Sequence, residues 1–161
     1  MPEDKQTTLR EQVAALLRGG SAHATLEQAV RGLTLAAAGA KPRQAPHTVW
    51  QLLEHTRIAQ WDILEFSRNP DHVSPEFPAG YWPPAAKPPS SLALRRSRAA
   101  VLTDRDAMIA LVLDPRRDLV APLPHAPDKT LLREALVLAD HNAYHVGQLV
   151  LARRWMRNWP D

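Results

Sequence analysis

The chain has 161 residues, a net charge of +3 and no cysteine, and these values exclude several classes of protein. Without cysteine there is no disulfide framework and no thiolate metal site, so any bound metal must have nitrogen or oxygen ligands. No apolar run reaches the roughly 18 residues of a membrane span, and the N-terminus lacks the layout of a secretory signal. We therefore expect one domain over residues 1–161, located in the cytoplasm.

Helical periodicity predicts the elements in chain order, between stretches that proline interrupts. We expect helices at about residues 8–18, 22–33, 48–67, 91–113 and 131–156. Ser21 is the expected N-cap of the second helix, and Thr130 or Asp128 that of the last. Residues 35–46 are typical of a loop, because they are rich in alanine, glycine and proline. No segment alternates apolar and polar residues for long, so we predict no strands.

These elements favour an all-α, up-and-down helical bundle with one long proline-rich crossover. The crossover, residues 70–89, mixes prolines with aromatic residues. We expect it to pack Tyr81 and Trp82 against the bundle as a rigid connection. The alternative is a lid or pocket wall that contacts a ligand, because loops of this length are often functional.

A pair of histidines in the last predicted helix, His141 and His145, is the most informative chemical feature. Residues four apart lie on one helical face, one turn above the other, so both imidazoles can bind the same ion. His55 lies on the apolar face of the helix expected at 48–67 and is the third candidate ligand. Three histidines with open positions are typical of a catalytic divalent site. The alternative is hydrogen-bonded histidines packed in the core.

A hydrolytic reaction would also need a general base, and the sequence does not single one out. In the zincin motif a glutamate follows the first histidine, whereas Asn142 stands there in this chain. Four carboxylates are candidates, although a solvated side chain or a hydrogen-bond partner of a ligand explains each of them better than a base does: Glu54, Asp62, Glu134 and Asp140. No nucleophile motif and no phosphate-binding loop occurs.

The two histidine segments resemble those of the DinB/YfiT-like superfamily. Residues 46–55 (PHTVWQLLEH) and 140–149 (DHNAYHVGQL) are similar to a pattern with one histidine late in the second bundle helix and H-x-x-x-H-x-G-Q-L in the last. The resemblance covers roughly residues 22–156. It implies a four-helix bundle with a divalent ion on His55, His141 and His145. The helix expected at 8–18 would be an addition to that fold.

The resemblance also implies a range of functions. Characterised relatives include transferases and isomerases that use low-molecular-weight thiols, and others are described as hydrolases; homodimers are frequent among them. We therefore expect a metal-dependent enzyme acting on a small-molecule substrate, either a thiol transferase or a hydrolase. The alternative is a non-catalytic, metal-binding or stress-related dimeric bundle. The ion is left open among zinc, nickel, iron, manganese and copper, because imidazole ligands alone do not select one.

Two residues of the last motif and two arginine-rich segments have further interpretations. We expect Gly147 to allow a neighbouring helix or loop to approach closely, and Gln148 to bond a ligand histidine or a metal-bound water. Packing is the alternative for both. Residues 95–98 and 153–157 are rich in arginine. A solvated face or a favourable helix C-terminus explains them better than nucleic-acid binding does.

Overall fold

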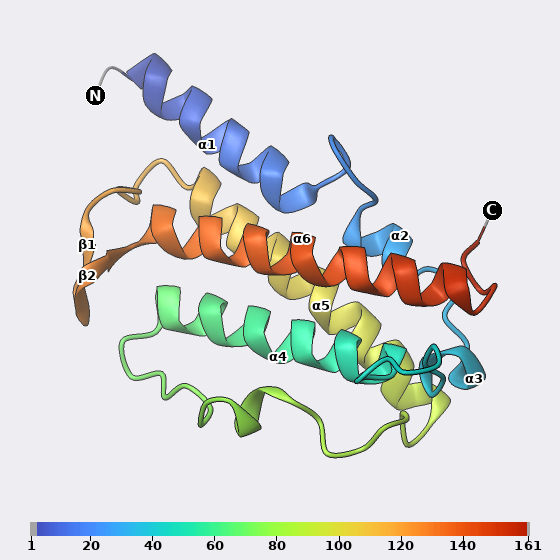
Figure 1. Ribbon diagram of the computed structural model, residues 1–161. Coiled ribbons are helices and arrows are strands. Elements are labelled where there is room, and N and C mark those ends of the chain that lie inside the picture. The colour runs from blue at the N-terminus through green and yellow to red at the C-terminus, as the bar shows by residue number, and fades with distance from the viewer. Residues whose placement is uncertain (1–2, 161) are drawn as a thin grey trace.

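The computed structural model describes residues 3–160, which form a helical bundle with one small hairpin (Figure 1). Four helices are long: α1 (Glu3–Arg18), α4 (Val49–Arg68), α5 (Ser91–Leu113) and α6 (Leu131–Trp155). Three helical segments are short: α2 (Leu26–Val30), α3 (Leu35–Ala38) and the 3-10 turn η1 (Ala79–Tyr81). Helix α4 packs between α5 and α6, and α1 lies across α5 and α6. None of the helices in residues 3–160 combines the length and hydropathy that crossing a bilayer requires.

The ends of the long helices follow from side-chain caps. Thr48 accepts a hydrogen bond from the Gln51 backbone N–H, and the Gln51 side chain accepts one from the Thr48 N–H, which is a capping box. Ser90 caps α5 in the simpler way, and Thr130 caps α6. The three predicted helices at 48–67, 91–113 and 131–156 are therefore confirmed to within one residue at each end, with Thr130 rather than Asp128 as the cap.

The prediction for residues 22–33 was wrong in extent. The helix is only α2, and its N-cap is Thr25, which forms a capping box with Gln28, rather than Ser21. The chain leaves the helix at Arg31, whose backbone is extended. The segment 35–46 is not entirely a loop either, because Thr34 caps the one-turn helix α3.

Helix α1 begins at Glu3, earlier than the predicted residue 8. Its buried residues Val13, Ala14 and Leu17 belong to the same apolar cluster as residues of α5 and α6. This helix thus contributes to the bundle core.

A two-stranded antiparallel hairpin, β1 (Pro122–Leu123) and β2 (Ala126–Thr130), precedes α6 and was not predicted. Its strands have two and five residues, too few for an alternating pattern to be recognised, and both contain proline. His125 at the turn donates from Nε2 to the Phe66 carbonyl, at 2.8 Å, and so fixes the hairpin to the end of α4.

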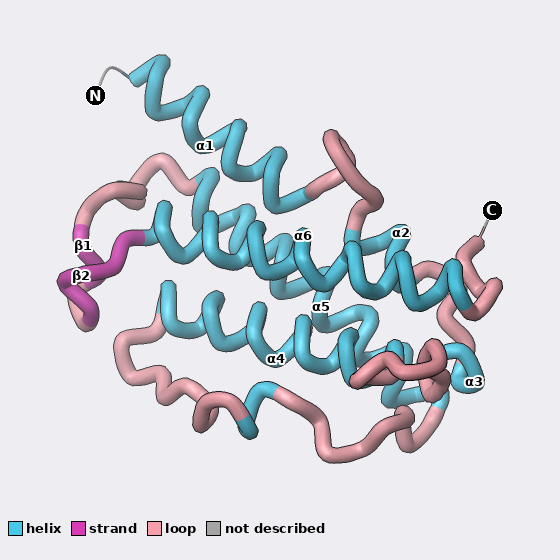
Figure 2. Tube along the Cα trace, in the orientation of Figure 1, coloured by secondary structure: helices cyan, strands magenta, loops and turns pink. Residues whose placement is uncertain are grey.

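The core has two apolar clusters with polar residues between them along α4 and α6. One cluster includes apolar residues between 49 and 53 on α4 and between 146 and 152 on α6; the other includes Leu64 and apolar residues between 131 and 139. The intervening turns carry buried polar side chains such as Gln60 and Asn142, which bond to each other at 2.7 Å. The three candidate ligand histidines lie in the same interval. The crossover loop runs along α4 (Figure 2).

Candidate metal centre

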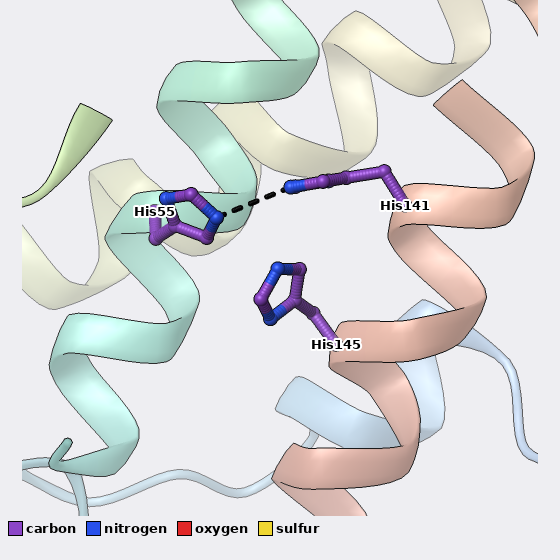
Figure 3. Close-up of side chains that lie close together, drawn as sticks. All are labelled: His55, His141 and His145. Atoms are coloured by element: carbon purple, nitrogen blue, oxygen red, sulfur yellow. Dashed lines mark hydrogen bonds between the residues drawn. The ribbon is translucent and has the colours of Figure 1, made fainter. Parts of the chain in front are cut away.

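The structure brings the three candidate histidines together. His55 on α4 faces His141 and His145, which project from successive turns of α6 (Figure 3). One ring nitrogen from each imidazole lies within 4.8 Å of the other two. His145 is buried, and His55 and His141 are partly buried. The arrangement gives three nitrogen donors from two rigid elements.

Hydrogen bonds to Nδ1 fix two of the rings. His55 Nδ1–H donates to the backbone carbonyl of Tyr81 at 2.9 Å, and His145 Nδ1–H donates to Gln148 Oε1 at 2.8 Å. Each bond holds the tautomer in which Nε2 carries a lone pair, the form that binds a metal. The expectation that Gln148 bonds a candidate ligand histidine is confirmed.

The nitrogens of His55 and His141 are spaced as two ligands of one ion would be. Their Nε2 atoms lie 3.2 Å apart, with His141 donating because the N–H of His55 is already bonded to Tyr81. Two nitrogens on a tetrahedral zinc ion, at bonds of 2.0–2.1 Å, are about 3.3 Å apart. Nδ1 of His141 is buried and bonds to no other described residue. The residues present therefore fit a divalent ion.

The imidazoles are held neutral. Burial, with the neighbouring His145 and His55 as lesser causes, lowers the pKa of His141 to about 3. Burial is also the main cause that lowers the pKa of His145, to about 4, and that lowers the pKa of His55. A neutral imidazole offers its lone pair without first releasing a proton, so His55 and His145, whose protons lie on Nδ1, are ready to ligate through Nε2 at neutral pH.

The crossover loop forms one wall of the site. The ring of Trp82 stacks on His55, with centroids 4.0 Å apart, and its other neighbour is His47, stacked at 3.9 Å. The loop is anchored by Asp62 on α4, whose carboxylate accepts from Tyr81 Oη at 2.6 Å and from His72 Nε2 at 2.7 Å. The crossover thus packs on the bundle as predicted, and it does so on a candidate ligand itself.

None of the four candidate bases belongs to the histidine cluster. Glu54 pairs with Arg57 at 2.8 Å, Glu134 with Arg133, and Asp62 anchors the loop. Asp140 is exposed. Burial, and secondarily Asp62, raises the pKa of Tyr81 to about 12. That phenol therefore stays protonated and serves as a hydrogen-bond donor.

The interpretation of Gly147 was wrong. A Cβ added at this exposed position would meet nothing within 4 Å, so no described element approaches it closely. The interpretation of the arginine-rich segment 153–157 as a solvated face needs one change. Arg153 is 1% exposed and donates from Nη1 to the carbonyls of Ala29 and Arg31, at 2.7 and 2.9 Å. That guanidinium therefore joins α6 to the end of α2.

Two groups that hold the site were not predicted from the sequence, the Tyr81 carbonyl and the indole of Trp82. The signal was the aromatic pair in the proline-rich segment. Its contact with His55 could not be assigned, because a loop without periodicity gives no register against a helix.

The fold and the site place this chain among helical-bundle proteins that carry a candidate metal centre between two facing helices. The family model for the DinB superfamily matches residues 8–149, and the chain belongs to this superfamily. The match includes residues 8–18, which sequence analysis treated as an addition. No curated protein and no solved structure matches the chain.

Proposed function

We propose that the protein is a divalent-metal-dependent enzyme whose ion is held by His55, His141 and His145. The observation that carries this proposal is the convergence of three neutral imidazoles within 4.8 Å, two of them oriented through Nδ1. Three protein ligands leave coordination positions for water or a small-molecule substrate. A bound ion would supply a Lewis acid, or would lower the pKa of a water or thiol.

The chain's own residues would orient the ligands and restrict access of water. The Tyr81 carbonyl and Gln148 set the ring orientations of His55 and His145. Trp82 covers one face of His55 and so shields that side of the site. Groups of this kind typically change metal affinity or activity by about 10- to 100-fold when removed.

The reaction we propose is thiol transfer or hydrolysis of a small molecule, and the absence of a base in the cluster bears on it. The cluster contains only histidines among its candidate ligands. No described carboxylate joins the cluster, so an ion held by the three histidines would lower the pKa of a bound water or thiol, whose proton would pass to solvent.

The same observation supports a second candidate, a non-catalytic metal-binding bundle. A site that only stores or senses an ion needs no base. The two candidates differ in the coordination positions that remain for exogenous ligands. A catalytic site keeps at least one exchangeable position, whereas a structural site is closed by protein ligands.

Metal content tests the proposal. The untagged protein and the His141→Ala/His145→Ala variant would be purified in parallel, reconstituted with zinc, nickel, iron or manganese, and measured by elemental mass spectrometry. We expect about one ion per chain in the wild type and none in the variant, with helicity retained. The loaded protein would then be assayed with thiol-transfer and hydrolytic substrates. Equal metal content in both proteins would contradict the site; a loaded but inactive protein would favour the binding role.

A further inference from the structure

A pocket of about 140 Å³ lies next to the histidine cluster, between the segment before α4 and the C-terminal half of α6. Its lining includes Ala45 and His47 from that segment, Leu52 from α4, and Gln148 and Ala152 from α6. None of the described residues that line it carries a carboxylate, ammonium or guanidinium group. The function proposed above does not use this pocket.

The pocket begins one helical turn from the candidate ligands on both helices. Leu52 precedes His55 by three residues on α4, and Gln148 follows His145 by three residues on α6. The two helices are antiparallel, so both displacements point toward the same end of the bundle (Figure 1). Three residues correspond to a rise of about 4.5 Å. The lining of the pocket therefore begins about this far along the bundle from the candidate ligands.

Two side chains connect the pocket with the site. Gln148 lines the pocket while its Oε1 accepts the hydrogen bond from His145. His47 lines the pocket while its ring stacks on Trp82, which in turn stacks on His55. The pocket and the histidine cluster thus share supporting residues, while His55, His141 and His145 themselves lie outside the lining of the pocket.

The size and polarity of the pocket define the group that it fits. An apolar cavity of about 150 Å³ accommodates a benzene molecule. A charged group would lose hydration in this lining without gaining an ionic partner, which is costly. His47 adds no charge at neutral pH, because burial, and secondarily Lys41, lowers its pKa.

We propose that this pocket binds an uncharged, apolar group the size of a benzene ring, which is part of a substrate whose polar end reaches the three histidines. The inference rests on the proposed function, because it assigns the polar end to the metal centre. It adds a substrate class: small molecules with a compact apolar group adjacent to a metal-binding group.

Two hydroxamates separate the pocket from the metal centre. Acetohydroxamate and benzohydroxamate both chelate a divalent ion through two oxygens, but only the second has a ring for the pocket. Titration calorimetry on zinc-loaded protein would measure both affinities. We expect benzohydroxamate to bind at least about tenfold more tightly, since burying the ring adds an apolar contact to the same chelate.

Filling the pocket is the matched test. Ala152→Leu and Ala45→Leu each place a larger side chain in the pocket. Ala152 belongs to the apolar core, whereas Ala45 lies in the segment before α4 and outside that core. Ala110→Leu, at an exposed position of α5 that does not line the pocket, is the control. We expect the two filled variants to bind benzohydroxamate no more tightly than acetohydroxamate, with their affinity for acetohydroxamate unchanged. The control should have the same two affinities as the wild type.

The outcomes distinguish this inference from the proposed function. Equal affinities of the wild type for the two hydroxamates, or tighter binding of benzohydroxamate in both filled variants, would refute the role of the pocket. Neither result would contradict the metal centre. Failure of both hydroxamates to bind zinc-treated wild-type protein would contradict the open metal centre and this inference with it.

Discussion

Two sets of largely buried histidines in this protein are bonded in opposite ways. His72 and His125 each direct Nε2 at an oxygen, the carboxylate of Asp62 at 2.7 Å and the carbonyl of Phe66 at 2.8 Å. The histidines of the candidate centre direct ring nitrogens at one another instead, with Nε2 of His55 and His141 3.2 Å apart.

The difference shows what a buried imidazole does in each place. A ring nitrogen bonded to oxygen ties a segment of chain to the bundle, and His72 and His125 do this for the crossover loop and the hairpin. Nitrogens that converge without an oxygen between them suit a shared cation. Burial does not separate the two sets. The group that Nε2 faces does, because it is an oxygen for His72 and His125 and another imidazole for His55 and His141.

Removing one histidine from each set should produce the largest difference in metal binding. His141→Ala should abolish metal binding, because it removes one of only three ligands, whereas His72→Ala should leave about one ion per chain. Elemental analysis of both variants after reconstitution measures this. Loss of metal from the His72 variant, or retention in the His141 variant, would show that the two sets are not distinct.

The aromatic neighbours of the two sets give the next contrast. Trp82→Ala removes the ring stacked on His55, and we expect metal affinity to fall by about 10- to 100-fold, as for other groups that orient a ligand. Trp61→Ala removes the ring packed edge-on against His72 and should leave affinity unchanged. Competition with a chelator of known affinity provides the measurement. Equal losses in the two variants would argue for a general structural cause.

The anchoring set should matter for stability. Asp62→Ala leaves the Tyr81 hydroxyl and His72 Nε2 without their buried acceptor, so we expect a loss of about 1–3 kcal/mol in the free energy of unfolding. Asp140→Ala, at an exposed position, is the control and should change it by less than about 0.5 kcal/mol. Urea denaturation of chelator-treated protein would reveal the difference, and indistinguishable midpoints would refute the anchoring role.

The candidate centre should also make the stability of the protein depend on pH. The pKa of His141 is lowered to about 3, below its ordinary value of 6.5, so the folded state disfavours the proton that the unfolded state accepts. The stabilisation is complete above about pH 6.5 and is lost as the pH falls below it, by about 1.4 kcal/mol per pH unit for one such imidazole.

A matched variant isolates this effect. In chelator-treated protein, His141→Leu should show a shallower decline in the free energy of unfolding between pH 7 and pH 5 than the wild type. Denaturant titrations at several pH values would measure both slopes. Parallel slopes would mean that His141 accepts a proton as readily in the folded protein as in the unfolded chain.

Sequence patterns predicted the parts of this protein that are periodic. Helices α4, α5 and α6 carry long apolar repeats with recognisable caps, and the spacing of His141 and His145 follows from helical geometry alone. The helix predicted at 22–33 was too long, because several polar residues before α2 could each have been its N-cap. Only the structure shows that Thr25 forms the capping box. The hairpin was missed because strands of two and five residues have no usable pattern.

The surroundings of the site were less predictable than the candidate ligands. The bond from His55 to the Tyr81 carbonyl joins residues 26 apart in the chain, through a loop with no register against the helix. The same limit explains why Asp62 was a candidate base in the sequence and is a loop anchor in the structure. The interpretation of Gly147 was wrong for a different reason. A glycine in a sequence motif does not reveal whether the space around it is filled or open.

X-ray absorption spectroscopy of the zinc-reconstituted protein would show whether His55, His141 and His145 hold one ion. We expect three imidazole nitrogens at about 2.0–2.1 Å and at least one additional oxygen ligand, which added acetohydroxamate would displace. A spectrum with fewer than three imidazoles, or a protein that takes up no ion, would refute the three-histidine site.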